Sequence, residues 1–319
     1  MAFRNQTQLA KVALIDINGG TTPTPSGNPM PTMIVNSNNN TIQGLRIRGG
    51  KYSNLFFQNN ASNNLVRCNI INNSINFNGV ILFSNNNNNT IQENYIFFNS
   101  GAGVRIFSGT GNKIRNNSIA YNSSSGILID ANINDNNDSD TGPNNKQNFP
   151  VIVSAGLNEI TGTFQGASNV TLTLDFYSNT AADPSGFGEG ETPLGSTTIT
   201  TGGSGSASFT FNGTFVAGTF ISATATDADN NTSQFSNVMA VTSPCPPALS
   251  LVSPADYING ATVIRQATAS ITAKNKITGN ANVTYRAANF ILLAPETGGN
   301  AGFVVNNGAV FPTQLIGCQ

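Results

Sequence analysis

Residues 89–96 read Asn-Thr-Ile-Gln-Glu-Asn-Tyr-Ile, and residues 103–106 read Gly-Val-Arg-Ile. The same pattern of asparagine, glycine and apolar residues returns every 23 to 25 residues in the first half of the chain. Three columns of apolar residues keep this period: Ile42, Val66, Ile91 and Ile114; Ile47, Ile71, Ile96 and Ile119; and Phe56, Val80, Val104 and Ile127. A fixed period of this length is typical of units that stack on one another.

The apolar triplets are too short to form stable strands alone, because a single coil cannot bury its apolar side. Stacking at the ~4.8 Å spacing of neighbouring strands pairs the backbone groups above and below each coil. It also joins the Ile, Val and Phe side chains into one continuous core. The repeat therefore predicts parallel β-coils over about residues 33–133.

One column of the repeat is asparagine and contains Asn69, Asn94 and Asn117. Side-chain amides at the strand spacing can donate to and accept from one another along a stack, as in amyloid ladders. Alternatively these residues turn the corners of the coils, because asparagine tolerates left-handed backbone angles. The sequence leaves both interpretations open, and both support the same fold.

The composition excludes several classes of function. Charged residues make up 9% of the chain and the formal net charge is −1, so nucleic acid and anionic membranes are not expected as partners. Histidine is absent, which excludes histidine bases, histidine metal ligands and Ser-His or Cys-His nucleophiles. No apolar run approaches the ~20 residues of a membrane span.

The periodicity changes after the repeat, and we predict an all-β chain of three modules. The first, residues 1–148, is a parallel β-helix of stacked coils with an N-terminal cap. In residues 149–243, about seven alternating strands at roughly ten-residue spacing indicate an Ig-like β-sandwich. Residues 244–319 carry shorter strands, which predict a small stacked-strand β domain.

The chain has three cysteines, of which Cys245 and Cys318 bracket the last module. We expect a disulfide between them, closing a loop of about 73 residues and contributing roughly 4 kcal/mol in the chain-entropy model. Cys68 lies in the repeat in one column with Gly44 and Asn116, so we expect a small, partly buried thiol.

Residues 34–133 resemble the right-handed parallel β-helix repeats of the pectate-lyase-like superfamily. The stretches 140–150 and 183–190 resemble the segment that joins such helices to an Ig-like module in large bacterial surface proteins. The tail, with residues 283–287 and 307–318, is similar to a stacked-strand domain of secreted Bacteroidetes proteins. The resemblance implies exposure at the cell surface, and we expect a mature or excised portion of a secreted protein.

The superfamily includes enzymes that cleave acidic polysaccharides, so catalysis is an alternative that the residues must support. Such chemistry needs paired carboxylates or acids that hold calcium. Residues 34–133 contain only two acidic residues, Glu93 and Asp130. They are about one and a half coils apart and are expected on different faces of the helix. Five arginines could bind an anionic glycan or provide solubility: Arg46, Arg48, Arg67, Arg105 and Arg115. We therefore predict no catalytic residues.

Asp135, Asp138 and Asp140 follow the last coil, separated by Asn and Ser and followed by Gly142. This spacing and oxygen richness could ligate calcium between modules. It equally suits a solvated turn in which Asp and Asn side chains bond to nearby amides. Calcium is the one cofactor that the sequence suggests.

The predicted function is that of a non-catalytic, extracellular structural or adhesive protein of the bacterial surface. As an adhesin it would present rigid coils to a glycan or a neighbouring cell; as a fibre subunit it would join other copies head-to-tail. Leu9, Val12, Leu14 and Ile17 form an apolar strand that could add to a neighbour's sheet or pair within its own first coil. The remaining alternative is a β-helix protein that binds or degrades polysaccharide.

Overall fold

The computed structural model describes residues 15–21, 30–130, 134–242, 248–252, 255–268, 270–287, 289–294, 303–305, 309–310 and 312–314. It divides the chain into two compact units, Met1–Thr242 and Ser243–Gln319. Within the described residues the regular structure is β-strand apart from three short 3-10 turns, η1 (Gly19–Thr21), η3 (Asn136–Asp138) and η4 (Pro143–Lys146). The all-β prediction is confirmed.

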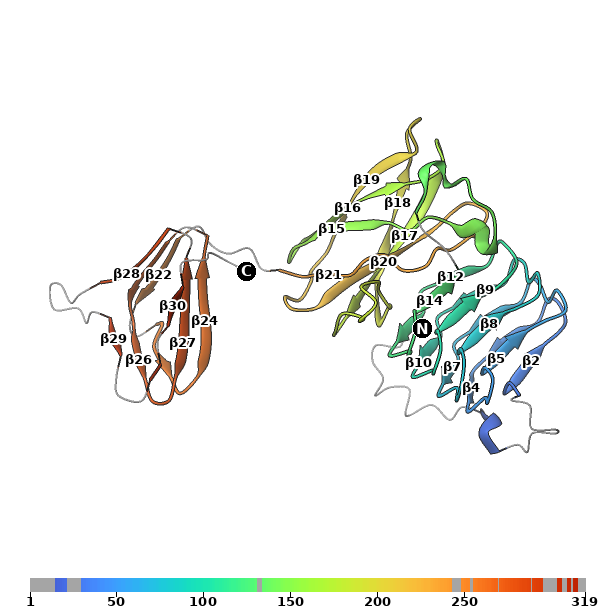
Figure 1. The fold of residues 1–319 in the computed structure, drawn as a ribbon, viewed down its shortest axis with the longest axis horizontal. Coiled ribbons are helices and arrows are strands. Elements are labelled where there is room, and N and C mark those ends of the chain that lie inside the picture. Colours follow the sequence, from blue (N-terminus) through green and yellow to red (C-terminus); the bar gives the residue numbers. More distant parts are fainter. Residues whose placement is uncertain are drawn as a thin grey trace. The chain divides into compact units, whose positions relative to one another are not determined.

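The N-terminal residues form a parallel β-helix whose coils contribute strands to three sheets (Figure 1). The first sheet contains β1 (Ile15–Asn18), β4 (Leu45–Arg48), β7 (Ile70–Asn72), β10 (Tyr95–Phe97) and β13 (Ser118–Ala120). The second contains β2 (Met33–Val35), β5 (Leu55–Phe57), β8 (Val80–Leu82), β11 (Val104–Ile106) and β14 (Ile127–Ile129). The third contains β3 (Thr41–Gln43), β6 (Leu65–Arg67), β9 (Thr90–Gln92) and β12 (Lys113–Arg115).

The register confirms two of the predicted apolar columns and corrects the third. Those that begin at Ile42 and Ile47 pair residue for residue across the coils. In the third, Val80 pairs with Leu55 and not with Phe56, which points outward beside Ile81. The prediction was one residue off because positions 55–57 are all apolar and hydrophobicity alone does not select the inward pair.

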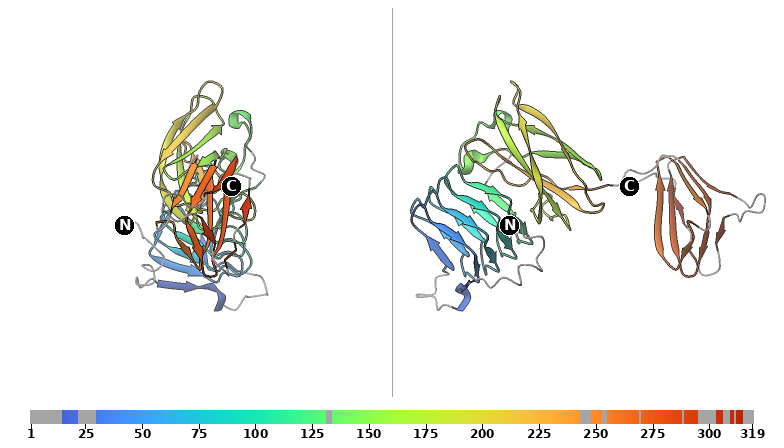
Figure 2. Two further views of the ribbon diagram at one scale, coloured as in Figure 1. Left: turned by 90° about the vertical axis from the view of Figure 1, so that its left-hand side faces the viewer. Right: turned by 180° about the vertical axis from the view of Figure 1, so that it is seen from behind.

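The second module, which belongs to the same compact unit, consists of two antiparallel sheets (Figure 2). One contains β15 (Val151–Ala155), β16 (Glu159–Gln165) and β19 (Ser206–Asn212). The other contains β18 (Thr192–Thr200), β17 (Thr171–Asn179), β20 (Phe220–Thr226) and β21 (Met239–Ala240). Side chains from both sheets share one core, which includes Phe164, Phe176 and Ile221.

The C-terminal unit is a second, shorter stack of parallel strands. Its three sheets are β22 (Ala248–Val252), β25 (Ser270–Lys274) and β28 (Phe290–Leu293); β23 (Ile258–Asn259), β26 (Lys276–Thr278) and β29 (Val304–Val305); and β24 (Thr262–Ala267), β27 (Asn282–Ala287) and β30 (Thr313–Gln314). Tyr285 is fully buried at its centre and donates from its hydroxyl to Asn275 Oδ1 at 2.7 Å. The predicted disulfide partners Cys245 and Cys318 lie outside the described residues.

Candidate functional site

Asn69, Asn94 and Asn117 lie one above another inside the β-helix and are each 1% exposed. Asn69 Nδ2 donates to Asn94 Oδ1 at 3.0 Å, and Asn94 Nδ2 donates to Asn117 Oδ1 at 2.9 Å. The corner itself is turned by the preceding column, in which Gly44, Cys68, Glu93 and Asn116 have φ between 53° and 69°. The two roles that the sequence left open therefore belong to adjacent residues: one column turns the chain and the next one bonds.

Two further asparagine ladders run along the same helix. Asn40, Asn64, Asn89 and Asn112 donate from one side chain to the next at 2.8 to 3.1 Å. The other connects Asn54 to Asn99 and Asn99 to Asn122, both at 2.9 Å. The inner rungs Asn64, Asn89 and Asn99 each use both the donor and the acceptor of their carboxamide within the stack, so these buried polar groups are satisfied without water.

The last rung of each of these two ladders bonds to a residue beyond the repeat. Asn144 Oδ1 accepts from the backbone N–H of Asn112 at 3.0 Å, while Glu189 Oε1 accepts from Asn122 Nδ2 at 2.9 Å. Burial raises the pKa of Glu189 to about 7. Neither Asn144 nor Glu189 can be recognised as a ladder terminus from the sequence, because neither follows the 24-residue period.

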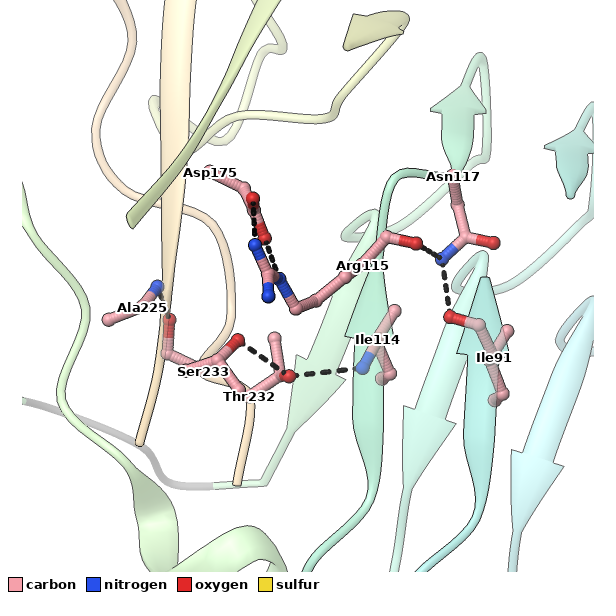
Figure 3. A network of polar contacts seen from close by, with 9 residues as sticks. Ile91, Ile114, Arg115, Asn117, Asp175, Ala225, Thr232 and Ser233 are labelled. Atoms are coloured by element: carbon pink, nitrogen blue, oxygen red, sulfur yellow. Dashed lines mark hydrogen bonds and ion pairs between the residues drawn. The ribbon is translucent and has the colours of Figure 1, made fainter. Parts of the chain in front are cut away.

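The second module covers the C-terminal end of the β-helix (Figure 3). Thr232 Oγ1 accepts from the backbone N–H of Ile114 at 3.0 Å, and Ile119 forms an isolated antiparallel bridge with Gly190. Phe235 and Tyr177 of the module complete the apolar core of the helix. The fit is close, since a Cβ at Gly126 would lie 2.7 Å from the Phe235 ring.

A buried ion pair fixes this junction. Arg115, at the end of β12, donates from Nε to Asp175 Oδ2 at 2.5 Å and from its terminal nitrogen to Oδ1 at 2.7 Å (Figure 3). The Asp175 side chain on β17 is 3% exposed. The hydrogen bond to this carboxylate raises the pKa of Arg115 above its usual value. Such a two-pronged contact gives the junction a defined orientation.

Asp135, Asp138 and Asp140 come together after the last coil, with one carboxylate oxygen of each within 4.8 Å of the others. Both Asp138 oxygens accept hydrogen bonds, from Gln147 Nε2 at 3.0 Å and from the backbone of Asn148 at 3.1 Å. Burial raises the pKa of Asp138 to about 6. Lys146 lies 3.3 Å from Asp140, so one base faces three acids.

Two oxygens of this cluster have no hydrogen-bond partner although they are buried: Asp135 Oδ1 and Asp140 Oδ1. A purely hydrogen-bonded turn would satisfy such atoms, because an unpaired buried acceptor is costly. The cluster also contains a bond typical of a turn, in which Ser139 Oγ donates to Asp135 Oδ2 at 2.9 Å.

A run of contacting rings lies on the outer side of the second sheet, and we call Tyr52, Phe56, Phe77, Phe83 and Phe107 the aromatic strip. Tyr52 and Phe56 are half-buried. Its centroids lie 4.6 Å apart for Tyr52–Phe77, 5.5 Å for Phe56–Phe83 and 5.1 Å for Phe83–Phe107. Phe77, Phe83 and Phe107 remain 38% to 46% exposed. The 24-residue interval between Phe83 and Phe107 is a signal that sequence analysis could have used.

The charged residues of the helix are dispersed. Glu93 follows a strand of the third sheet and Asp130 follows a strand of the second. Asp130 is paired with Arg105 at 2.6 Å, and Arg48 with Asp16 at 2.9 Å. With Arg115 also paired, three of the five helix arginines are neutralised by a carboxylate, which disfavours a strongly anionic ligand on this surface.

The N-terminal strand pairs within its own helix as far as the structure describes it. Ile17 lies opposite Ile47 in the parallel pairing of β1 with β4. Leu9, Val12 and Leu14 lie outside the described residues. Cys68 is partly buried, and burial together with the neighbouring Glu93 raises the pKa of its thiol, which disfavours the reactive thiolate.

Residues 24–162 match the family described as a right handed beta helix region. Together with the stacked parallel strands, this match identifies the N-terminal fold as a right-handed parallel β-helix. No curated protein matches the chain. Among the described residues, no helix is long and apolar enough to span a membrane.

Proposed function

We propose that the chain is a non-catalytic, extracellular structural or adhesive protein of the bacterial surface, and that the aromatic strip holds it to a neutral polysaccharide. The carrying observation is the strip itself, five contacting rings across three successive coils of a rigid helix. Contiguous apolar surface of this kind marks interaction sites more often than it serves stability.

The chemistry of the strip favours an uncharged sugar surface as partner. Tyr52 and Phe77 are tilted by 34° and Phe56 and Phe83 by 32°, so each pair leaves part of a ring face open beside its neighbour. The apolar C–H face of a pyranose can lie against such rings. Arg105, whose guanidinium carbon lies 5.4 Å from the centroid of Phe107, is paired with Asp130.

The covered end of the helix supports adhesion over fibre formation. Head-to-tail stacking of β-helices needs free strand edges at both ends. Contacts of Thr232, Gly190 and Phe235 occupy the C-terminal end, so a second copy would have to displace the second module. We infer that this module is an Ig-like sandwich that acts as the cap.

Retention on crystalline cellulose and on chitin tests the proposal. We expect the full chain to sediment with at least one of them and the double variant Phe83→Ser/Phe107→Ser to bind at least tenfold more weakly. Phe98→Ser is the matched control, since Phe98 is 53% exposed and stacked on Tyr121 but follows a strand of the first sheet. Far-UV circular dichroism verifies the folding of each variant. Equal retention of wild type and the double variant, or no retention on either solid, contradicts the proposal, and release of reducing ends would favour the degrading alternative.

We propose further that Asp135, Asp138 and Asp140 hold calcium. Calcium takes 6 to 8 oxygen ligands. Within the described residues Asp135 Oδ1 and Asp140 Oδ1 have no hydrogen-bond donor, so both could bind the ion. We expect calcium to raise the melting midpoint and chelator to lower it. The corresponding gain in the free energy of unfolding is about 2.7 kcal/mol at a hundredfold excess of calcium over Kd. Asp140→Asn should abolish this response and the exposed control Glu159→Gln should keep it. If the melting midpoint does not change with calcium, the three acids form only a hydrogen-bonded turn.

A further inference from the structure

A cavity of about 330 Å³ opens where the last coil of the helix meets residues 179–191. Tyr121, Thr180, Asp183, Glu189 and Glu191 are among the residues that line it. The sequence does not reveal this site, because the cavity combines residues 120–123 of the last coil with a loop of the second module. We call it the acidic cavity.

The three carboxylates of the acidic cavity are held in place by neutral donors. Glu189 is 8% exposed and accepts from the backbone and the side chain of Asn122 at 3.1 and 2.9 Å. Glu191 Oε1 accepts from the Tyr121 hydroxyl at 3.1 Å, while its Oε2 accepts from the backbone and the hydroxyl of Thr180 at 2.9 and 2.8 Å. These bonds orient the carboxyl groups, and none of the donors carries a positive charge.

No basic residue lines the cavity, and within the described ranges no lysine or arginine pairs with Asp183, Glu189 or Glu191. The effect on Glu189 is visible, since burial and then the charge of Asp183 raise the pKa of this carboxyl group. A cation inside the cavity would offset both the burial of the Glu189 carboxylate and its repulsion by Asp183. The protein therefore provides negative charge that a ligand can neutralise.

The size and the aromatic wall indicate what kind of cation fits. The cavity volume is in the range of pockets that bind small organic molecules. A single metal ion would leave most of this space unfilled. In addition, the only acids that the described residues gather within metal-ligand distance are Asp135, Asp138 and Asp140. Tyr121 is stacked on Phe98 at 5.2 Å and remains 43% exposed, so its ring can attract an organic ammonium group.

From this combination we propose that the acidic cavity binds a small organic cation that carries a primary ammonium group. The ammonium group combines a positive charge with N–H donors, so it can bond to one carboxylate of the cavity while its charge offsets that of the others. An amino sugar and a lysine side chain both carry this group on a body of suitable size. The inference is independent of the aromatic strip, which lies on the outer side of a different sheet.

Calorimetric titration of the full chain with glucosamine, glucose and Nα-acetyl-lysine amide tests the charge requirement. Glucosamine and glucose share one ring and differ in the ammonium group. We expect glucosamine to bind at least tenfold more tightly than glucose, and comparison with the lysine derivative distinguishes the two sources of the ammonium group. Binding of both glucosamine and Nα-acetyl-lysine amide would identify the ammonium group as the recognised feature.

Asp183→Asn and Glu191→Gln should each weaken binding of the tighter ammonium probe tenfold or more. The control Glu159→Gln replaces an exposed acid on β16 and should leave this affinity unchanged. Two separate variants are used because Glu191 also holds the 180 region through Thr180. Equal affinity for glucose and glucosamine, no heat with either ammonium probe, or unchanged binding in Asp183→Asn would overturn the proposal. The outcome of these titrations does not depend on whether the aromatic strip binds polysaccharide.

Discussion

Replacing Asn94 by alanine tests the internal ladder at its most connected rung. Its side chain donates to Asn117 Oδ1, Val66 O and Gln92 O, each at 2.9 Å, and accepts from the backbone and side chain of Asn69 at 3.1 and 3.0 Å. Alanine leaves the Asn69 backbone N–H unpaired and removes a donor from the Val66 carbonyl. At about 1–3 kcal/mol for each orphaned buried group, we expect unfolding to become easier by about 3 kcal/mol.

Urea denaturation followed by far-UV circular dichroism measures this change as a shift of the midpoint at constant slope. The matched control is Asn76→Ala, because Asn76 is exposed and donates only to Lys51 O, at 2.8 Å. We expect it to cost less than about 0.5 kcal/mol. If Asn94→Ala costs no more than Asn76→Ala, the ladder does not stabilise the helix and the asparagines are retained for some other reason.

Three further substitutions probe the junction of the helix and the second module. Arg115→Met leaves Asp175 buried without its partner and should cost about 3–5 kcal/mol in urea midpoint measurements, whereas a loss below 1 kcal/mol would mean that the carboxylate finds another partner. Phe235→Ala empties a site that is 2% exposed in the core of the helix and should cost about 3–5 kcal/mol, and an unchanged midpoint would contradict the capping role. Because the pKa of Glu189 rises from 4.5 to about 7 on folding, the native state holds this proton longer, so the free energy of unfolding falls as pH rises from about 4.5 to about 7. Glu189→Gln should reduce that fall by about 2–3 kcal/mol across the window, and a pH profile identical to that of the wild type would show that Glu189 does not titrate there.

The β-helix could be predicted because the apolar period and the strand spacing constrain each other. Ile91 must lie over Val66 if every coil is to bury its one apolar side, and the structure pairs them. The same logic did not fix Phe56, since a coil with three successive apolar residues can be shifted by one without a change in pattern. Register within such a triplet depends on the length of the preceding corner, which a hydrophobic period does not encode.

The junction could not be predicted, because its contacts join residues far apart in the chain. Arg115 and Asp175 are separated by 60 positions, and Asn122 and Glu189 by 67. A repeat reveals residues that are equivalent to one another, whereas the ladder terminus Glu189 and the capping ring of Phe235 each occur once. At this end of the helix the sequence indicated only that Asp135, Asp138 and Asp140 lie together, since they are close in the chain and share one chemistry.

The most direct test of the adhesive account is hydrogen exchange of the full chain in the presence and absence of the polysaccharide that retains it. We predict slower exchange in peptides that contain β5, β8 and β11 and the corners that carry Phe77, Phe83 and Phe107, with no change in β3, β6 and β9 of the third sheet. Protection confined to the third sheet, or no protection anywhere in the helix, would contradict the aromatic strip as the contact face.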